Sequence, residues 1–255
     1  MVPTKLGQVD SPTFAQAVNQ ASVAVSREEN RPVLTGIRVQ FQGDKVIMSS
    51  TDRFRLARSS FTWTPEDATI STTALVRGSL LRDMARSLDE HQNVTIDFDA
   101  DNPSLLGFEN AGRVSTSQLI DGEFPAVDRL YADEYPIHAV INKQASSTHQ
   151  ARFAGRRTQR PDPYGLLRPG ADAVGRHRRR STGEGDSRHR HGRRGHHRAF
   201  NPSYLVDGLS AISEPFVRMK MTTAVKPVEF NGQQEADSDE SMDYRYLLVP
   251  MRFNN

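Results

Sequence analysis

Histidines gather in one stretch of the sequence, where they could bind a metal. Six of the eight lie between residues 145 and 199. The densest group occupies nine consecutive positions and consists of His189, His191, His196 and His197. A short His-rich tract of this kind is one compositional sign of metal binding. This sign of metal binding is weak here, because the histidines lie among many arginines and their spacing matches no regular pattern of metal ligands.

The remaining residues that could perform chemistry do not form a catalytic set. Asp97, Asp99 and Asp101 are spaced like part of a calcium loop, but the central Gly and distal Glu of such a loop are missing. His91 and His138 are isolated and read as surface residues. There is no phosphate-binding Gly loop, no G-x-S-x-G motif and no Cys. We therefore expect no catalytic site and no bound metal or cofactor.

Charge is distributed very unevenly along the chain. The whole sequence has 33 Lys and Arg against 31 Asp and Glu, a net charge of +2. Residues 145–199 contain 14 Arg, no Lys and four acidic residues, a net charge of +10, so the other 200 residues carry −8. The whole-chain charge therefore describes neither part, and the basic block needs its own explanation.

Residues 1–130 have the pattern of an α+β domain. Ser11 and Pro12 mark a helix start, and apolar residues follow at helical spacing as far as Val25. Ser79 begins a second helix of the same kind. Alternating or apolar runs predict strands at 35–41, 46–48, 54–63, 74–76, 94–98, 106–108 and 114–119. Residues 121–129, with Gly122 and Pro125, read as a linker.

A second domain is expected from residue 131 onward. Residues 137–141 predict a strand, no period of 2 or 3.6 persists from 145 to 198, and Ser203 begins a helix. Strands are then expected at 217–221, 228–230 and 244–253. Three pairs of residues match at a spacing of 124, namely Ser79 and Ser203, Leu81 and Leu205, and Asp83 and Asp207. A repeat of this length indicates a duplicated domain.

Several motifs resemble the bacterial sliding clamp, the β subunit of DNA polymerase III. Thr51–Ala57 and Asp121–Pro125 are similar to its middle domain, Phe200–Leu205 to its third domain and Leu247–Phe253 to its C-terminal strand. The resemblance covers residues 1–143 and 199–255. It implies the DNA-clamp fold, an α+β fold of helices packed on curved antiparallel sheets. Residues 1–130 would be the middle domain and 131–255 the C-terminal domain.

The resemblance also implies a function. Members of the family are processivity factors, non-catalytic subunits of the polymerase holoenzyme, a nucleotidyltransferase. They encircle duplex DNA as a head-to-tail homodimer. The family's first domain has no counterpart here, so the usual ring contact is not expected. Basic residues on or near the inner helices would face phosphates without reading bases, and the candidates are Arg27, Arg31, Arg77, Arg82 and Arg86.

A second implied site is an apolar pocket that captures short peptides of the polymerase catalytic subunit, the clamp loader and other partners. Leu, Pro, Val and Met side chains suit such a pocket, and Arg55 and Arg252 could bind peptide carbonyl or carboxylate groups. Matched position by position, the pocket residues are Leu34, Thr51, Arg53, Phe54, Arg55, Leu56, Pro125, Arg129, Leu130, Asn201, Tyr204, Val225, Pro227, Leu247, Leu248, Val249, Pro250, Met251, Arg252 and Phe253.

The Arg-rich segment 145–198 interrupts the C-terminal domain. One interpretation is a basic arm, which would make the chain a nucleic-acid-binding protein using residues 145–199. The interpretation that we favour is a shift of reading frame in a GC-rich gene. Codons can be chosen so that reading one base along gives an amphipathic helix, a strand and a hairpin in the family's order. We expect the segment as translated to be disordered.

No apolar run approaches the length of about 20 residues that a membrane span requires. The N-terminus also lacks the apolar core of a secretory signal. The sequence therefore predicts a cytoplasmic protein without membrane partners.

Overall fold

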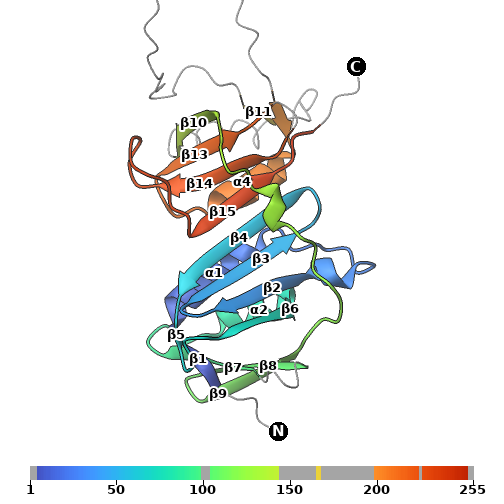
Figure 1. Ribbon diagram of the computed structural model, residues 1–255, viewed down its shortest axis with the longest axis vertical. Coiled ribbons are helices and arrows are strands. Elements are labelled where there is room, and N and C mark those ends of the chain that lie inside the picture. The colour runs from blue at the N-terminus through green and yellow to red at the C-terminus, as the bar shows by residue number, and fades with distance from the viewer. Residues whose placement is uncertain (1–4, 99–103, 144–164, 168–197, 224–225, 252–255) are drawn as a thin grey trace, which may run out of the picture.

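The computed structural model describes residues 5–98, 104–143, 165–167, 198–223 and 226–251. Its first 118 residues contain the same unit twice, a strand, a helix and three strands (Figure 1). The first unit is β1 (Lys5–Asp10), α1 (Ser11–Ser22), β2 (Gly36–Gln42), β3 (Lys45–Thr51) and β4 (Arg55–Thr62), with the 3-10 helix η1 (Pro32–Thr35) after α1. The second is β6 (Ser71–Arg77), α2 (Gly78–Arg86), β7 (Asn93–Phe98), β8 (Leu105–Asn110) and β9 (Arg113–Gln118). The short β5 (Thr64–Pro65) lies between them.

The rest of the chain repeats part of this plan. The 3-10 helix η2 (Asp128–Leu130) and β10 (Ile137–Asn142) come first. After β11 (Gly165–Leu167), the chain forms β12 (Arg198–Phe200), α4 (Pro202–Ala211), β13 (Phe216–Met221), β14 (Val228–Gln233) and β15 (Tyr244–Leu248). The strand–helix order at residues 71–98 thus recurs at 198–221, where the sequence predicts a duplicated unit.

All the strand pairs are antiparallel, and the units exchange strands. β1 of the first unit joins the second unit in a five-stranded sheet with the order β5-β1-β7-β8-β9. β6 of the second unit joins the first in an eight-stranded sheet, β10-β13-β14-β15-β4-β3-β2-β6. β15 pairs with β4, with Leu247 opposite Leu56, so one sheet runs through both halves of the chain.

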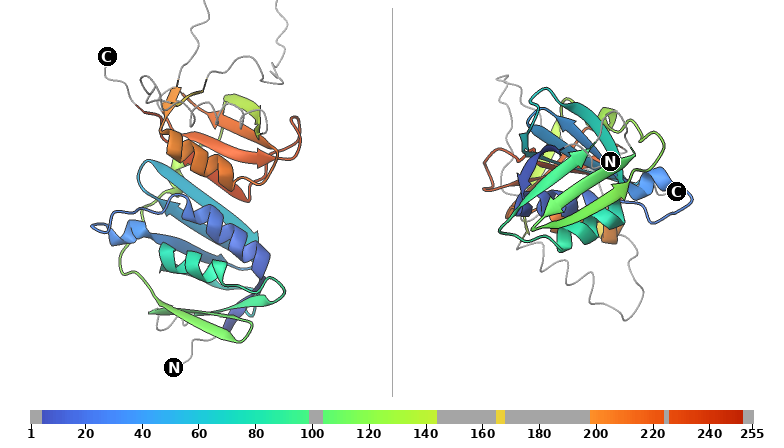
Figure 2. Two further views of the ribbon diagram at one scale, coloured as in Figure 1. Left: turned by 180° about the vertical axis from the view of Figure 1, so that it is seen from behind. Right: turned by 90° about the horizontal axis from the view of Figure 1, so that it is seen from below.

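The two sheets and their helices enclose the main core. Phe14 on α1 lies 6.3 Å from Phe61 on the eight-stranded sheet and 5.7 Å from Phe108 on the five-stranded sheet, measured between ring centroids. Leu81 of α2 is fully buried in the same cluster. Seen from behind, α1, α2 and α4 lie on one face of the molecule (Figure 2). The apolar stripes at helical spacing are therefore the surfaces that dock the helices on the sheets.

Three local expectations differ from the structure. Asp10, not Ser11, caps α1, because its carboxylate accepts a hydrogen bond from the Thr13 amide, while the Ser11 hydroxyl donates to the Gln92 carbonyl. β1 was not expected, since its sequence is mostly polar and it is held by pairing with β7. The last strand ends at Leu248 rather than at residue 253, shortly before Pro250, which has no amide hydrogen for a strand ladder.

Most of segment 145–198 lies outside the described residues, including the His-rich tract. Within it, β11 pairs with β12, so residues 165–167 depart from the expected disorder. β12 precedes α4 just as β6 precedes α2, so the pairing of β11 with β12 corresponds to the pairing of β2 with β6. In the described ranges no helix is long and apolar enough to cross a membrane.

Candidate functional site

Residues 119–136 connect β9 to β10, and we call this segment the linker. It crosses the face of the eight-stranded sheet that lies opposite the helices. Figure 1 shows it in green, passing the junction of β4 and β15. Hollows lie on both of its sides, and Glu123 lines both of them. The linker is therefore the element that shapes the candidate sites on this face.

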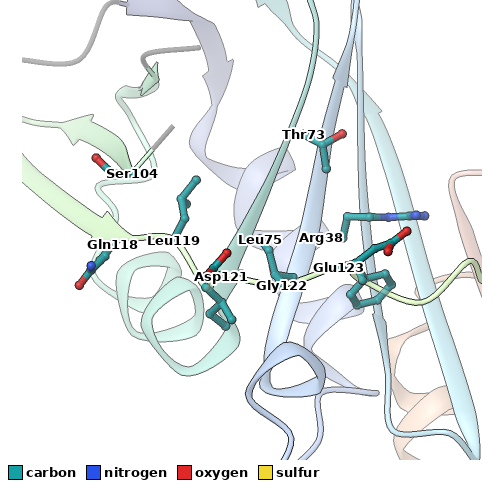
Figure 3. A pocket seen from close by; sticks show the side chains of 11 residues that line it. Arg38, Thr73, Leu75, Ser104, Gln118, Leu119, Asp121, Gly122 and Glu123 are labelled. Carbon is teal, nitrogen blue, oxygen red and sulfur yellow. The ribbon is translucent and has the colours of Figure 1, made fainter. Parts of the chain in front are cut away.

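The larger hollow, of about 590 Å³, lies between the start of the linker and the β6 edge of the sheet. Figure 3 shows its lining, in which Leu75 and Leu119 stand among polar side chains such as Thr73 and Gln118. None of its lining residues belongs to the pocket predicted from sequence, although residues 121–124 are part of a motif that resembles the clamp family.

The second hollow, of about 460 Å³, is mostly apolar, and we call it the linker groove. It is lined by Arg31, Pro32, Val33, Leu34, Thr51, Arg53, Glu123, Pro125, Val127 and Leu130. Leu34, Thr51, Arg53, Pro125 and Leu130 belong to the pocket expected from sequence. They come from η1, from the turn between β3 and β4, and from the linker. Folding thus brings together three stretches that are up to 96 positions apart in sequence.

Other lining residues were not expected there. Pro32 and Val33 adjoin Leu34, and Val127 adjoins the Pro125 motif, so apolar continuity along the chain could have pointed to them. Arg31, one of the residues predicted to face DNA, is also among the residues that line the groove. The structure therefore gives the groove a charged rim as well as an apolar floor.

The rim depends on the turn between β3 and β4. The Asp52 carboxylate accepts hydrogen bonds from the amides of Phe54 and Arg55, at 3.1 and 3.0 Å, which fixes the turn. Arg53 adopts a φ of 80°, in the left-handed region that non-glycine residues seldom occupy. Its guanidinium then pairs with Glu28 at 2.9 Å. Both side chains are about half exposed, so a polar ligand can compete for them.

Several predicted pocket residues are buried instead. Leu56 and Leu247 are 2% and 3% exposed, and they pack beneath the linker residues Phe124 and Val127. Leu248 is fully buried on the opposite face of the sheet. Leu56 and Leu247 thus support the linker from beneath, and none of the three side chains is exposed to a peptide. Pro250 is also buried.

A second apolar surface lies where β15 ends beside the start of β4. The Val249 amide donates to the Phe54 carbonyl at 2.9 Å, and the two side chains are 39% and 51% exposed. Met251 is 41% exposed. Arg129 is exposed on η2, and Pro227 is partly buried before β14. Val225, Arg252 and Phe253 lie outside the described residues.

Arg55 forms a junction between the two halves of the chain. Its guanidinium pairs with Asp52 at 2.9 Å and with Asp207 of α4 at 2.7 Å, and lies 4.1 Å from the Tyr204 ring centroid. Burial is the strongest single influence and disfavours its charge, but Asp207, Tyr246 and Asp52 together outweigh burial and raise the pKa of Arg55. With a side chain only 8% exposed, Arg55 serves the fold and is not free for a peptide. Asn201 caps α4.

The remaining predicted basic residues lie on the surface. Arg82 and Arg86 lie on α2, and Arg77 immediately precedes it. Arg77 and Arg86 are exposed and Arg82 is partly exposed. Arg27 is exposed in the loop after α1. Neither α1 nor α4 contains a Lys or Arg, so α2 provides the cations among these three α-helices.

Metal-binding alternatives find no support in the described ranges, where no group of three or more His, Asp or Glu residues is placed to hold an ion. Asp97 is described, and burial followed by repulsion from Glu109 raises the pKa of its carboxyl. Asp99 and Asp101 lie outside the described ranges. His91 and His138 are exposed.

Comparison with known proteins gives a consistent family. Residues 8–126 match the family model described as the DNA polymerase III beta subunit, central domain, and residues 195–252 match its C-terminal domain. Residues 127–194, which include most of the Arg-rich segment, fall between the two matches.

Individual relatives agree with the family models. The chain is 34% identical to the beta sliding clamp of Streptomyces coelicolor, over 99% of this chain and 68% of that protein. It is 38% identical to the Micrococcus luteus beta sliding clamp, over 60% of this chain and 49% of that protein. The crystal structure of a DNA polymerase sliding clamp from Bacillus subtilis has the same fold, with a TM-score of 0.75 at 19% identity, covering 98% of this chain and 65% of that one. The chain belongs to the DNA polymerase III beta subunit, or beta sliding clamp, family.

Proposed function

We propose that this chain acts as a sliding-clamp subunit that captures partner peptides in the linker groove. The observation that carries the proposal is the groove itself, in which apolar residues from η1 and from the linker converge beside Thr51 and Arg53. A concave apolar surface with a few charged groups at its rim suits a short peptide with apolar anchors. Phe54, Val249 and Met251 extend the apolar surface available to such a peptide.

Replacing Leu130 tests the groove. Leu130 lines it and is 48% exposed, so Leu130→Asp should leave the core intact while placing a charge where an apolar anchor would bind. We expect at least a tenfold loss of affinity for peptides selected on the wild-type chain from a random nonapeptide phage library, measured by fluorescence anisotropy. Val114→Asp is the matched control, because Val114 is an exposed apolar residue on β9, away from the groove. Equal peptide affinity of both variants would argue against the proposal.

We further propose that the face carrying the helices contacts duplex DNA through α2. Support comes from the arginines on and beside α2 and from the absence of Lys and Arg on α1 and α4. Such contacts would be to phosphates and therefore independent of base sequence.

Salt dependence tests the contact with DNA. Each phosphate contact contributes about 0.9 to the slope of log K against log salt concentration. Arg86→Gln should therefore reduce the slope by about 1. Arg113→Gln, which removes an exposed arginine from β9, should leave it unchanged. Equal slopes for Arg86→Gln and the wild type would count against α2 as the contact.

A further inference from the structure

Three basic side chains on the sheet hold the linker from below. An oxygen of the Asp128 carboxylate lies 3.1 Å from Arg38 of β2, and the other lies 3.4 Å from Arg58 of β4. Further along, the guanidinium carbon of Arg245 on β15 lies 3.8 Å from the Tyr131 ring centroid. The linker is therefore tied to strands of both halves of the chain.

The basic residues are themselves fixed. The Arg38 side chain is 11% exposed and lies 5.1 Å from the centroid of the Phe124 ring. Arg245 makes two hydrogen bonds, of 2.6 and 2.9 Å, with Glu229, whose side chain is fully buried. Asp128, whose side chain is 54% exposed, is thus tied to Arg38, a mostly buried cation with little freedom to follow it.

The same stretch of linker forms a wall of the groove. Pro125, Val127 and Leu130 line it on either side of Asp128, which is itself not a lining residue. The Leu130 amide donates to the Val127 carbonyl at 2.9 Å, so the turn moves as a unit. The position of this wall relative to Leu34 and Thr51 therefore depends on where Asp128 is held.

We propose that Asp128 is a positioning residue for peptide capture, acting through Arg38 and Arg58 to hold the groove open at one width. The inference rests on the proposed function of the groove. Ion pairs of a half-exposed carboxylate contribute little to global stability. They can nevertheless limit the positions that a loop samples, and a preorganised wall loses less freedom when a peptide binds. The Asp128 ties should therefore matter more for peptide affinity than for folding.

The test compares full-length variants with the library-selected peptide whose binding is lost in Leu130→Asp. Asp128→Asn should weaken its binding about five- to tenfold and leave the thermal midpoint within about 2 °C of the wild type. Asp128→Glu, which keeps the charge, should restore affinity to within about twofold. Asp133→Asn is the matched control, since Asp133 is an exposed carboxylate of the same linker with no ion pair in the described ranges. It should bind as the wild type does.

A double-mutant cycle adds a readout that a purely structural role would not produce. If Asp128 acts through the arginines, adding Arg58→Gln to Asp128→Asn should cost less peptide affinity than Arg58→Gln does alone. Wild-type affinity of Asp128→Asn, or a midpoint lowered by more than about 5 °C, would overturn the inference and leave the groove proposal standing. Failure to select any peptide sensitive to Leu130→Asp would remove the proposed function and the inference together.

Discussion

Arg55 shows how a single residue can change its role between sequence and structure. Its motif suggests a cation that binds a peptide, yet its side chain is almost fully buried between Asp52, Asp207 and Tyr204. Asp207 is 152 positions away in sequence, so local pattern could not reveal the pairing. The ion pair between Arg55 and Asp207 therefore links the two halves of the molecule.

Removing that charge should destabilise the fold. Arg55→Met would leave the Asp52 carboxylate, 12% exposed, without its cation, while Asp207 at 47% exposure could turn to water. Loss of one partner of a fully buried pair costs about 3–5 kcal/mol, and the exposure of Asp207 lowers our expectation to about 2–3 kcal/mol. Urea unfolding followed by circular dichroism measures the change.

Arg86→Met is the control for this prediction. Arg86 is 74% exposed and lies 3.6 Å from Asp83, so its loss should change the free energy of unfolding by about 0.5 kcal/mol or less. Equal unfolding midpoints for the two variants would show that the Arg55 junction does not hold the halves together.

At the scale of elements, the strands β13, β14 and β15 carry a buried polar network on the face under the linker. Glu229 on β14 is fully buried between Arg245 and Lys220, with nitrogen–oxygen distances of 2.6 and 3.4 Å. Burial disfavours its charge, but the hydrogen bonds from Arg245 and Tyr135 prevail and lower the pKa of Glu229. Burial, and then the bond to Glu229, raises the pKa of Tyr135 to about 12.

This network predicts the direction of a pH effect. The pKa of Glu229 is lower in the folded state, so in acid the unfolded chain binds more protons than the folded chain. The free energy of unfolding therefore decreases as the pH is lowered. The contribution is complete above the ordinary value of 4.5 and is lost as pH falls through the depressed folded value. Glu229→Gln should cost about 3 kcal/mol at pH 7, and its deficit relative to the wild type should shrink below about pH 4.5.

The measurement is the free energy of unfolding of Glu229→Gln and of the wild type at several pH values from 7 to 3. Glu235→Gln, in the exposed loop after β14, is the control and should parallel the wild type across the range. A deficit of Glu229→Gln that stays constant down to pH 3 would contradict the assignment.

At the scale of the whole molecule, the pairing of β15 with β4 continues one sheet through both halves of the chain. The apolar cluster beneath it combines Ala24 and Ala57 with Phe200 and Tyr246 from the C-terminal half. The junction is therefore both hydrogen-bonded and packed. The predicted domain boundary near residue 130 falls in the linker that lies across this junction.

The out-of-frame origin of residues 145–198 stays a prediction at this scale. Family matches on both sides of the segment, ending at 126 and resuming at 195, are what a local change of frame would produce. Sequencing the gene is the direct measurement. One inserted or deleted base near residue 145, with a compensating change near residue 198, should restore a clamp-like reading through the segment and keep the matched residues 195–252 in frame. A confirmed gene sequence in which no such shift does so would favour the basic-arm interpretation.

The family, the class of fold and most of the elements could be predicted from the sequence alone. Helical spacing found α1, α2 and α4, and alternation found most of the strands. Matching the chain position by position to the clamp family supplied half of the groove's lining. These signals are local, because they record which face of one element is apolar. β1 was not predicted, because its sequence is mostly polar and its strand conformation depends on pairing with β7.

Which of the motif residues face solvent depends on the packing of the folded chain. Leu56 and Leu247 belong to the predicted pocket, but the linker folds over them and buries both. Arg31, which the sequence placed only among the DNA-facing candidates, lines the groove with Leu34 and Leu130. Burial depends on what other segments lie above a residue, and here those segments are far away in sequence. Spacing along the chain can therefore name the residues of a site, while the packing of distant elements determines which of them a partner can reach.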